Sequence, residues 1–127
     1  MKSENKIVEL SFDFAITIIE LYKLLIDSKE FILSKQLLRS GTSIGANVEE
    51  AIAAQSRKDF ISKMSIASKE ARETRYWLRL LGKSQLVKLD YQHYLTKIEH
   101  IINILTKIVK TTVQTTSETI QNSTSKI

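Results

Sequence analysis

Few side chains in this chain could carry acid–base or metal chemistry, and their spacing does not suit it. His93 and His100 are the only imidazoles, and there is no cysteine. A di-iron site in a helical bundle needs Glu-x-x-His pairs. However, His100 directly follows Glu99, and the residue three before His93 is Asp90 rather than the Glu of that motif. We therefore predict a protein without a metal site, without a cofactor and without enzymatic activity.

Four glutamates form two close pairs along the chain, Glu49 with Glu50 and Glu70 with Glu73. Two neighbouring carboxylates could act as a general acid and a general base. No Gly-rich phosphate loop accompanies them, and the pattern does not predict a polar pocket around them. Salt bridges on the helix surface are the better interpretation of both pairs.

Positive charge is concentrated in one segment. The chain has 19 Lys and Arg against 14 Asp and Glu, a formal net charge of +5. Residues 56–83 hold eight of the basic residues and three of the acidic ones. On a helix whose inner face carries Met64, Ala71 and Leu78, the basic residues and one tyrosine lie on the outer face or beside it. These candidate nucleic-acid-binding residues are Lys58, Lys69, Arg72, Arg75, Tyr76, Arg79 and Lys83.

This row of residues has two interpretations. A row with about one positive charge per helical turn could follow the phosphates of a nucleic acid, and Tyr76 could stack on an unpaired base. The alternative is a solvated helix face on which Lys69 pairs with Glu73 at four-residue spacing. The residues by themselves leave both interpretations open.

The composition predicts a single, all-helical domain to position these residues. The 127 residues include no Pro and only three Gly, and 43% of them are apolar. Apolar residues at three- and four-residue spacing predict helices over about 7–26, 30–55, 56–82 and 91–110. The clearest seam consists of Phe60, Met64, Ala67, Ala71, Thr74, Leu78 and Leu81.

The ends of these helices carry recognisable signals. We expect Asp27, Ser28 and Glu30 to provide the cap of the second helix, Ser56 that of the third and Asp90 that of the fourth. Gly82 is expected to end the third helix in the left-handed conformation.

Two interior glycines, Gly41 and Gly45, lie on one face of the second helix. Each costs roughly 1 kcal/mol relative to Ala, so close approach of a neighbouring helix should compensate. A break or a bend at residues 40–43 is the competing interpretation.

The helix lengths and short connections predict an antiparallel up-down-up-down four-helix bundle over residues 1–112. Residues 113–127 are rich in Thr and Ser and lack apolar periodicity, so we expect a disordered tail there. Second apolar faces on the first and fourth helices predict a homo-oligomer. No signal peptide or membrane-spanning segment is recognisable, which predicts a cytoplasmic protein that does not contact a membrane.

The segment from Ser34 to Ala51, SKQLLRSGTSIGANVEEA, is followed by Phe60, Ala67, Glu70, Glu73 and Trp77-Leu78. This combination resembles a bacterial four-helix bundle family that includes the proteins encoded by intervening sequences of large-subunit ribosomal RNA genes. The family is similar to the accessory proteins of diversity-generating retroelements. The family's small-residue segment falls on Ser40, Gly41, Ser43, Gly45, Ala46 and Asn47, and its acidic pair on Glu49 and Glu50. We expect these residues to be structural.

The resemblance implies ring-shaped homo-oligomers, commonly pentamers, without an established enzymatic activity. It also implies nucleic-acid binding, which for the retroelement relatives means RNA and a partner reverse transcriptase. We therefore predict a non-enzymatic oligomeric bundle that binds RNA or DNA through the basic face of its third helix, without reading bases specifically. The alternative is a protein-interaction scaffold with no direct nucleic-acid binding.

Overall fold

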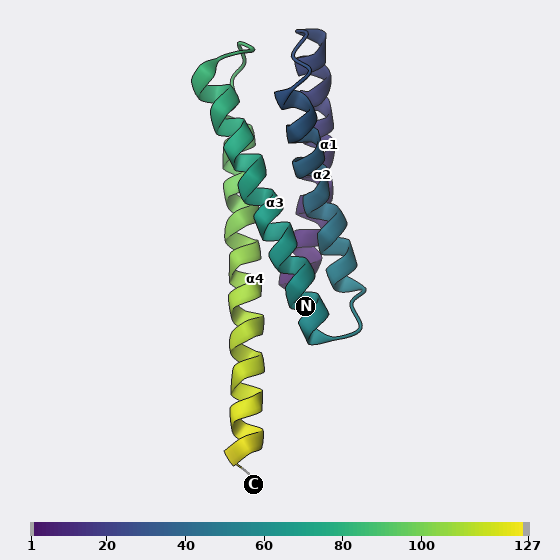
Figure 1. The fold of residues 1–127 in the computed structure, drawn as a ribbon, viewed down its shortest axis with the longest axis vertical. Coiled ribbons are helices and arrows are strands. Elements are labelled where there is room, and N and C mark those ends of the chain that lie inside the picture. The colour runs from purple at the N-terminus through teal and green to yellow at the C-terminus, as the bar shows by residue number, and fades with distance from the viewer. Residues whose placement is uncertain (1, 126–127) are drawn as a thin grey trace.

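The structure is a computed structural model that describes the backbone of residues 2–125 and the side chains of residues 4–115. It contains four helices, α1 (Lys2–Asp27), α2 (Leu33–Ile52), α3 (Arg57–Ser84) and α4 (Gln92–Ser125). No strand occurs in the part of the chain that is described. The predicted all-α class with four helices is therefore confirmed (Figure 1).

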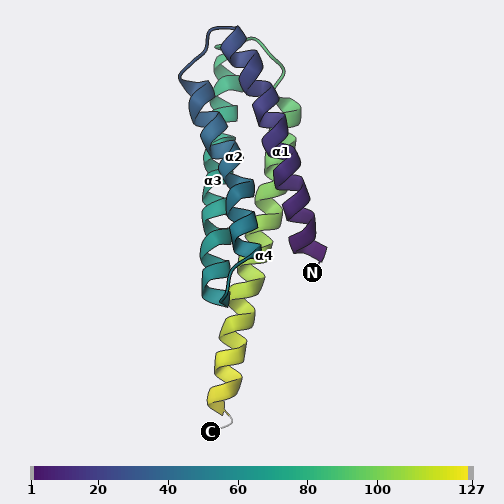
Figure 2. The ribbon, with the colours of Figure 1, turned by 90° about the vertical axis from the view of Figure 1, so that its right-hand side faces the viewer.

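The helices form a bundle in which each packs against its neighbours in the chain, and α1 also packs against α4. The α1–α2 and α3–α4 connections lie at one end of the bundle, and the α2–α3 connection lies at the other (Figure 2). This order of contacts places α1 diagonally opposite α3, and α2 diagonally opposite α4.

The bundle interior is filled by aliphatic side chains from all four helices. On α3 the predicted seam is confirmed, because Met64, Ala67, Ala71, Thr74, Leu78 and Leu81 are all buried. Phe60, at the beginning of that seam, is partly buried and packs against the core. The largest fully buried side chains are Ile7, Ile18, Leu21, Leu25, Leu37, Ile44, Met64, Leu78, Leu81, Ile98, Ile101 and Leu105.

The two interior glycines of α2 lie directly against α1. A Cβ atom on Gly41 would lie 2.9 Å from Cγ2 of Ile18, and one on Gly45 would lie 3.3 Å from the carbonyl oxygen of Ser11. The helix is continuous through both positions. Close approach is therefore confirmed, and the competing break at residues 40–43 is wrong.

The start of α2 is capped by Glu30, one of the three residues expected there. Its carboxylate accepts hydrogen bonds from the backbone N–H groups of Ile32 (3.2 Å), Leu33 (2.9 Å) and Ser34 (2.6 Å). Burial raises the pKa of Glu30, but the three N–H donors outweigh that effect and hold the pKa below its ordinary value. The cap of α3 is Ser56, as predicted, since its hydroxyl accepts from the N–H of Asp59 at 3.0 Å.

The end of α3 differs from the expectation at Gly82. No glycine has a positive φ among the described residues, and the helix continues past Gly82 to Ser84. The left-handed residue is Gln85, with φ of 50°. Its Nε2 donates to the carbonyl oxygens of Gly82 (3.0 Å) and Leu89 (3.1 Å). The two side-chain hydrogen bonds of Gln85 stabilise the turn, and a glycine at this position could not make them.

Helix α4 continues beyond the residue at which the apolar periodicity ends. It runs to Ser125 and extends past the end of the bundle (Figures 1 and 2). No Pro or Gly follows Gly82, so the two residues that most strongly disfavour a helix are absent from this part of the sequence. We predicted a disordered tail over residues 113–127, and the structure shows a helical backbone as far as Ser125. Residues 126–127 lie outside the described residues. The domain boundary at 112 stays a prediction.

None of the helices, over the residues described, has an apolar stretch long enough to cross a membrane.

Candidate nucleic-acid interface

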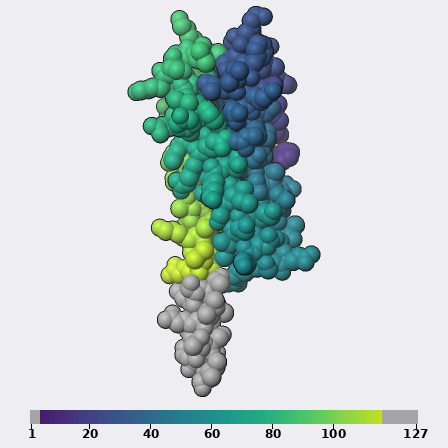
Figure 3. Space-filling model, in the orientation of Figure 1, coloured from purple at the N-terminus to yellow at the C-terminus, as the bar shows by residue number. Residues whose placement is uncertain are grey.

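All seven predicted binding residues lie on α3, and most of their side chains face solvent. Six are exposed, namely Lys58, Lys69, Arg72, Tyr76, Arg79 and Lys83, and Arg75 is partly buried. We call these seven residues the basic face of α3. The side chains of α3 cover much of the visible surface in the space-filling view, with α2 on one side and the visible part of α4 on the other (Figure 3).

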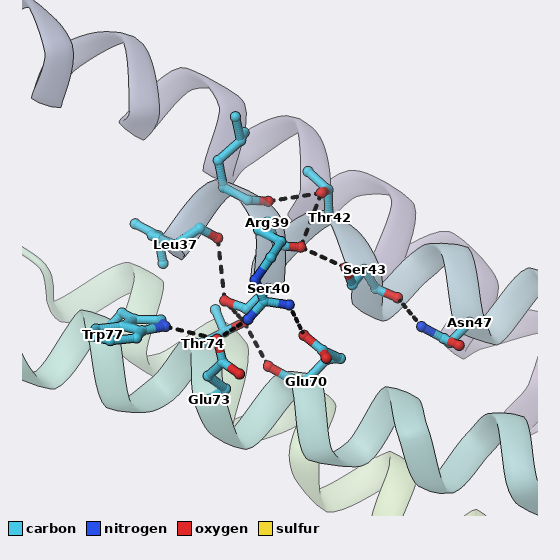
Figure 4. A network of polar contacts seen from close by, with 11 residues as sticks. Leu37, Arg39, Ser40, Thr42, Ser43, Asn47, Glu70, Glu73, Thr74 and Trp77 are labelled. Atoms are coloured by element: carbon cyan, nitrogen blue, oxygen red, sulfur yellow. Dashed lines mark hydrogen bonds and ion pairs between the residues drawn. The ribbon is translucent and has the colours of Figure 1, made fainter. Parts of the chain in front are cut away.

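Two of the three acidic residues of α3, Glu70 and Glu73, lie on the side that faces α2, where Arg39 binds them. Nη1 of Arg39 donates to Glu70 Oε2 at 3.1 Å, and Nη2 donates to Glu73 Oε2 (Figure 4). The hydrogen bond to Glu73, together with the negative charges of both glutamates, raises the pKa of Arg39 despite its partial burial. Trp77 Nε1 donates to the same Glu73 oxygen at 3.1 Å.

This network shows which groups Glu73 binds. The expected alternative paired Lys69 with Glu73 along α3, and the structure contradicts that pair because Glu73 lies against Arg39 and Trp77. The interpretation of the paired glutamates as salt-bridge residues is confirmed for Glu70 and Glu73. It is also confirmed for Glu50, which lies 3.8 Å from Nζ of Lys63.

The side of α3 that faces α4 carries two further polar contacts. Arg72 Nη2 donates to Thr106 Oγ1 at 3.1 Å, and Arg75 Nη1 lies 3.0 Å from both carboxylate oxygens of Glu99. Arg75 is thus neutralised by its partner. Within the described part of the chain, no ion pair engages Lys58, Lys69, Arg72, Arg79 or Lys83.

The tertiary structure brings residues of α4 to this face that the sequence analysis did not single out. A shallow groove between α3 and α4 is lined by Arg75 and Arg79 on one side and by Glu99, His100 and Asn103 on the other. The missed signal is a polar row on α4 at regular four- and three-residue spacing. It consists of Gln92, Thr96, Glu99, Asn103, Thr106 and Lys110.

Neither histidine belongs to a constellation of metal ligands. His93 and His100 are exposed, and His93 stacks near Tyr94 with ring centroids 3.8 Å apart. No group of three or more His, Asp or Glu side chains that could hold a metal ion occurs among the described residues. The absence of a metal and of a cofactor stays a prediction.

The geometry can be compared with known proteins. Residues 3–107 match the family model of the 23S rRNA-intervening sequence protein, which covers most of the bundle. The chain belongs to this family. A crystal structure of an S23 ribosomal protein family member of unknown function, from Bacteroides thetaiotaomicron VPI-5482, is 47% identical. The matched region covers 85% of this chain and 98% of the chain in that crystal structure, with a TM-score of 0.81. No curated protein sequence matches the chain.

The family assignment confirms the resemblance recognised from residues 34–78, and the similar crystal structure confirms the helical fold. The match ends at residue 107, before the last part of α4. All seven residues of the basic face therefore lie inside the region that defines the 23S rRNA-intervening sequence protein family.

Proposed function

We propose that this member of the 23S rRNA-intervening sequence protein family is a non-enzymatic cytoplasmic protein that binds RNA or DNA through the basic face of α3. Binding would be electrostatic and without base-specific readout, because the sequence carries no recognisable groove-reading motif. The retroelement relatives support a more specific role as an accessory to a reverse transcriptase. Capture of a reverse transcriptase encoded beside the gene would test that role.

The observation that carries this proposal is the position of Arg39. A solvated helix face would intersperse its cations with its carboxylates. Here Arg39 binds both Glu70 and Glu73 on the α2 side, and neither carboxylate pairs with a cation of the basic face. Arg75 apart, which Glu99 neutralises, the cations of the basic face make no ion pair among the described residues, and such a surface attracts phosphates.

We further propose that the antiparallel up-down-up-down bundle assembles into a ring of identical subunits, with five subunits as the family resemblance suggests. An exposed apolar surface on α1 supports self-association, since Phe12, Ile16 and Ile19 are 58%, 44% and 39% exposed. They face away from the core, and α1 does not pack against α3. Association through α1 would leave the basic face of each subunit open, and several copies on one ring would add avidity.

Charge reversal on the basic face tests nucleic-acid binding. The variant Arg72→Glu with Arg79→Glu should abolish the binding of both single-stranded and structured RNA, measured by fluorescence anisotropy at ~50 mM salt. A matched control, Lys23→Glu with Lys35→Glu, changes the net charge equally on exposed positions of α1 and α2. The control should retain most of the binding.

The proposal fails if the wild type binds neither RNA nor DNA at this salt concentration, or if the two double variants bind equally well. Circular dichroism and light scattering of the α3 variant should match those of the wild type, so that loss of binding reports charge rather than unfolding.

A second candidate is a protein-interaction scaffold. The apolar surface of α1 favours it, because Phe12, Ile16 and Ile19 could equally hold a different protein. Salt separates the two candidates. Electrostatic binding to nucleic acid weakens steeply as salt rises, whereas capture of a protein through an apolar surface persists.

A further inference from the structure

A hollow lies at the end of the bundle where α3 passes into α4. It has a volume of about 560 Å³, within the roughly 300–1,000 Å³ typical of small-molecule sites. Its walls come from the last three turns of α3, from the connection after it and from the start of α4. The polar and aromatic lining residues are Tyr76, Arg79, Lys83, Gln85, Asp90, Tyr91 and Gln92, and the apolar ones include Leu80, Leu89 and Leu95.

The chemistry of this lining fits one nucleotide. Two exposed cations one helical turn apart, Arg79 and Lys83, can contact a phosphate. Tyr76 lies on the same wall with 53% of its surface exposed, which leaves a ring available for stacking on a base. The side-chain oxygen of Gln85 and the second carboxylate oxygen of Asp90 can accept hydrogen bonds from a base edge, whereas the Gln85 amide N–H groups are used within the connection.

The site is held in shape before any ligand arrives. The ring of Tyr76 makes an edge contact with Trp77, with centroids 5.2 Å apart and planes at 69°. Trp77 is in turn anchored to Glu73, which Arg39 binds. An aromatic ring positioned in this way loses little conformational entropy when a base stacks on it.

The connection on the other side of the hollow is equally restrained. Gln85 joins Gly82 to Leu89 through two hydrogen bonds, of 3.0 and 3.1 Å. The buried hydroxyl of Tyr91 donates to the carbonyl of Val87 at 2.8 Å, and Asp90 Oδ1 accepts from the N–H of Gln92 at 2.9 Å. The hollow is therefore a built feature of the fold, not a gap beside a loose loop.

We propose that this hollow binds one unpaired nucleotide of a single-stranded nucleic acid, with the base stacked on Tyr76 and the backbone phosphate contacted by Arg79 and Lys83. This inference rests on the proposed function and adds the class of ligand, because a paired base inside a duplex has no face free to stack on Tyr76. The preference for unpaired nucleotides is thus a property of Tyr76, whereas attraction to phosphates is a property of the whole basic face.

The test compares Tyr76→Leu with Tyr76→Phe on matched probes. The probes are unstructured oligouridine and oligothymidine of about 12 nucleotides and a blunt RNA duplex of the same length, followed by anisotropy at ~50 mM salt. Leucine keeps apolar bulk without a π face, and phenylalanine keeps the ring. Tyr76→Leu should weaken binding of the single strand by about 5- to 100-fold. It should leave duplex binding unchanged, and Tyr76→Phe should bind like the wild type.

A control uses Phe31→Leu, which removes another exposed ring, 58% exposed, on the α1–α2 connection. It should bind every probe like the wild type. The inference is overturned if Tyr76→Leu binds single strands normally, or if it loses single-strand and duplex binding equally. It is also overturned if the wild type binds duplex alone, an outcome that leaves the proposed function standing. If the wild type binds none of the probes, the proposed function fails as well.

Discussion

The hydroxyl of Thr74 on α3 donates to the hydroxyl of Ser40 on α2 over 2.9 Å, and both side chains are completely buried. Ser40 in turn reaches the carbonyl oxygen of Leu37 at 3.4 Å, and the carbonyl oxygen of Glu70 lies 2.8 Å from Thr74 Oγ1. Each buried hydroxyl is therefore satisfied, and the pair links the two helices at a fixed register in an otherwise apolar interior.

Removing both members of this pair should cost less than the sum of the costs of removing each alone. We expect Thr74→Val to destabilise the protein by about 1–2 kcal/mol, because it takes the interhelical partner from buried Ser40. The double variant Ser40→Ala with Thr74→Val should be less destabilised than the sum of the single variants. Urea denaturation of all four proteins measures this coupling. Strict additivity would show that the two hydroxyls do not interact.

Arg39 should support nucleic-acid binding without touching the ligand. Arg39→Gln releases Glu70 and Glu73, whose charges then oppose phosphates near the basic face. It should weaken RNA binding by a few-fold more than Lys35→Gln, which removes the same charge from an exposed position of α2. Anisotropy titrations at low salt provide the comparison.

Neutralising the two carboxylates distinguishes this indirect effect from a direct one. Glu70→Gln and Glu73→Gln, added to Arg39→Gln, should restore the affinity for RNA. If Arg39 itself contacted phosphate, the triple variant would remain as weak as Arg39→Gln.

Adding a side chain should destabilise the protein at Gly41 and Gly45 but stabilise it at Gly82. Gly45→Leu should destabilise the protein by about 1–3 kcal/mol through overpacking against the α1 backbone at Ser11. Gly41→Ala should also destabilise it, since its Cβ would contact the buried, β-branched Ile18. Gly82→Ala should stabilise it by about 0.5–1 kcal/mol, because a Cβ there has ordinary contacts and the position is helical. Thermal and urea melts that ranked Gly82→Ala below the wild type would contradict this.

Acid should remove the contribution of the Glu30 cap. The pKa of Glu30 is lowered in the folded protein, so the carboxylate stabilises the fold above its unfolded pKa, near 4.5, and this stabilisation is lost as pH falls through the folded pKa. Glu30→Ala should cost about 0.5–2 kcal/mol at pH 7. The difference in Tm between the wild type and Glu30→Ala should shrink below about pH 4.5. A difference that stays constant down to pH 2 would argue against a charged cap.

The apolar surface of α1 should hold the oligomer together. We expect light scattering to give a mass several times the 14.5 kDa of one chain. Phe12→Glu with Ile16→Glu should shift it to the mass of a monomer while helicity is retained, because both side chains are exposed in the single bundle. Glu9→Gln with Glu20→Gln, at exposed polar positions of the same helix, is the control. A monomeric wild type would remove the oligomer from the proposal.

The sequence by itself determined the helices and the faces that they bury. The seam from Met64 to Leu81 and the small-residue pair Gly41 and Gly45 follow from spacing along one helix, which is a local property of the chain. The candidate basic face could be located for the same reason, since the periodicity of α3 decides which of its residues point outward.

Only the tertiary structure decided which charges remain free on that face. Glu73 has a cation four residues away in Lys69, yet it binds Arg39, which is 34 residues away in the chain. The hollow beside Tyr76 likewise depends on Gln85, which adopts the left-handed conformation although it is not a glycine, so the sequence does not mark that turn. The hollow also depends on the first turn of α4. Spacing along one helix shows that Lys69 could pair with Glu73, but it does not show that Arg39 of another helix lies closer. Which cation binds Glu73 depends on how α2 and α3 pack.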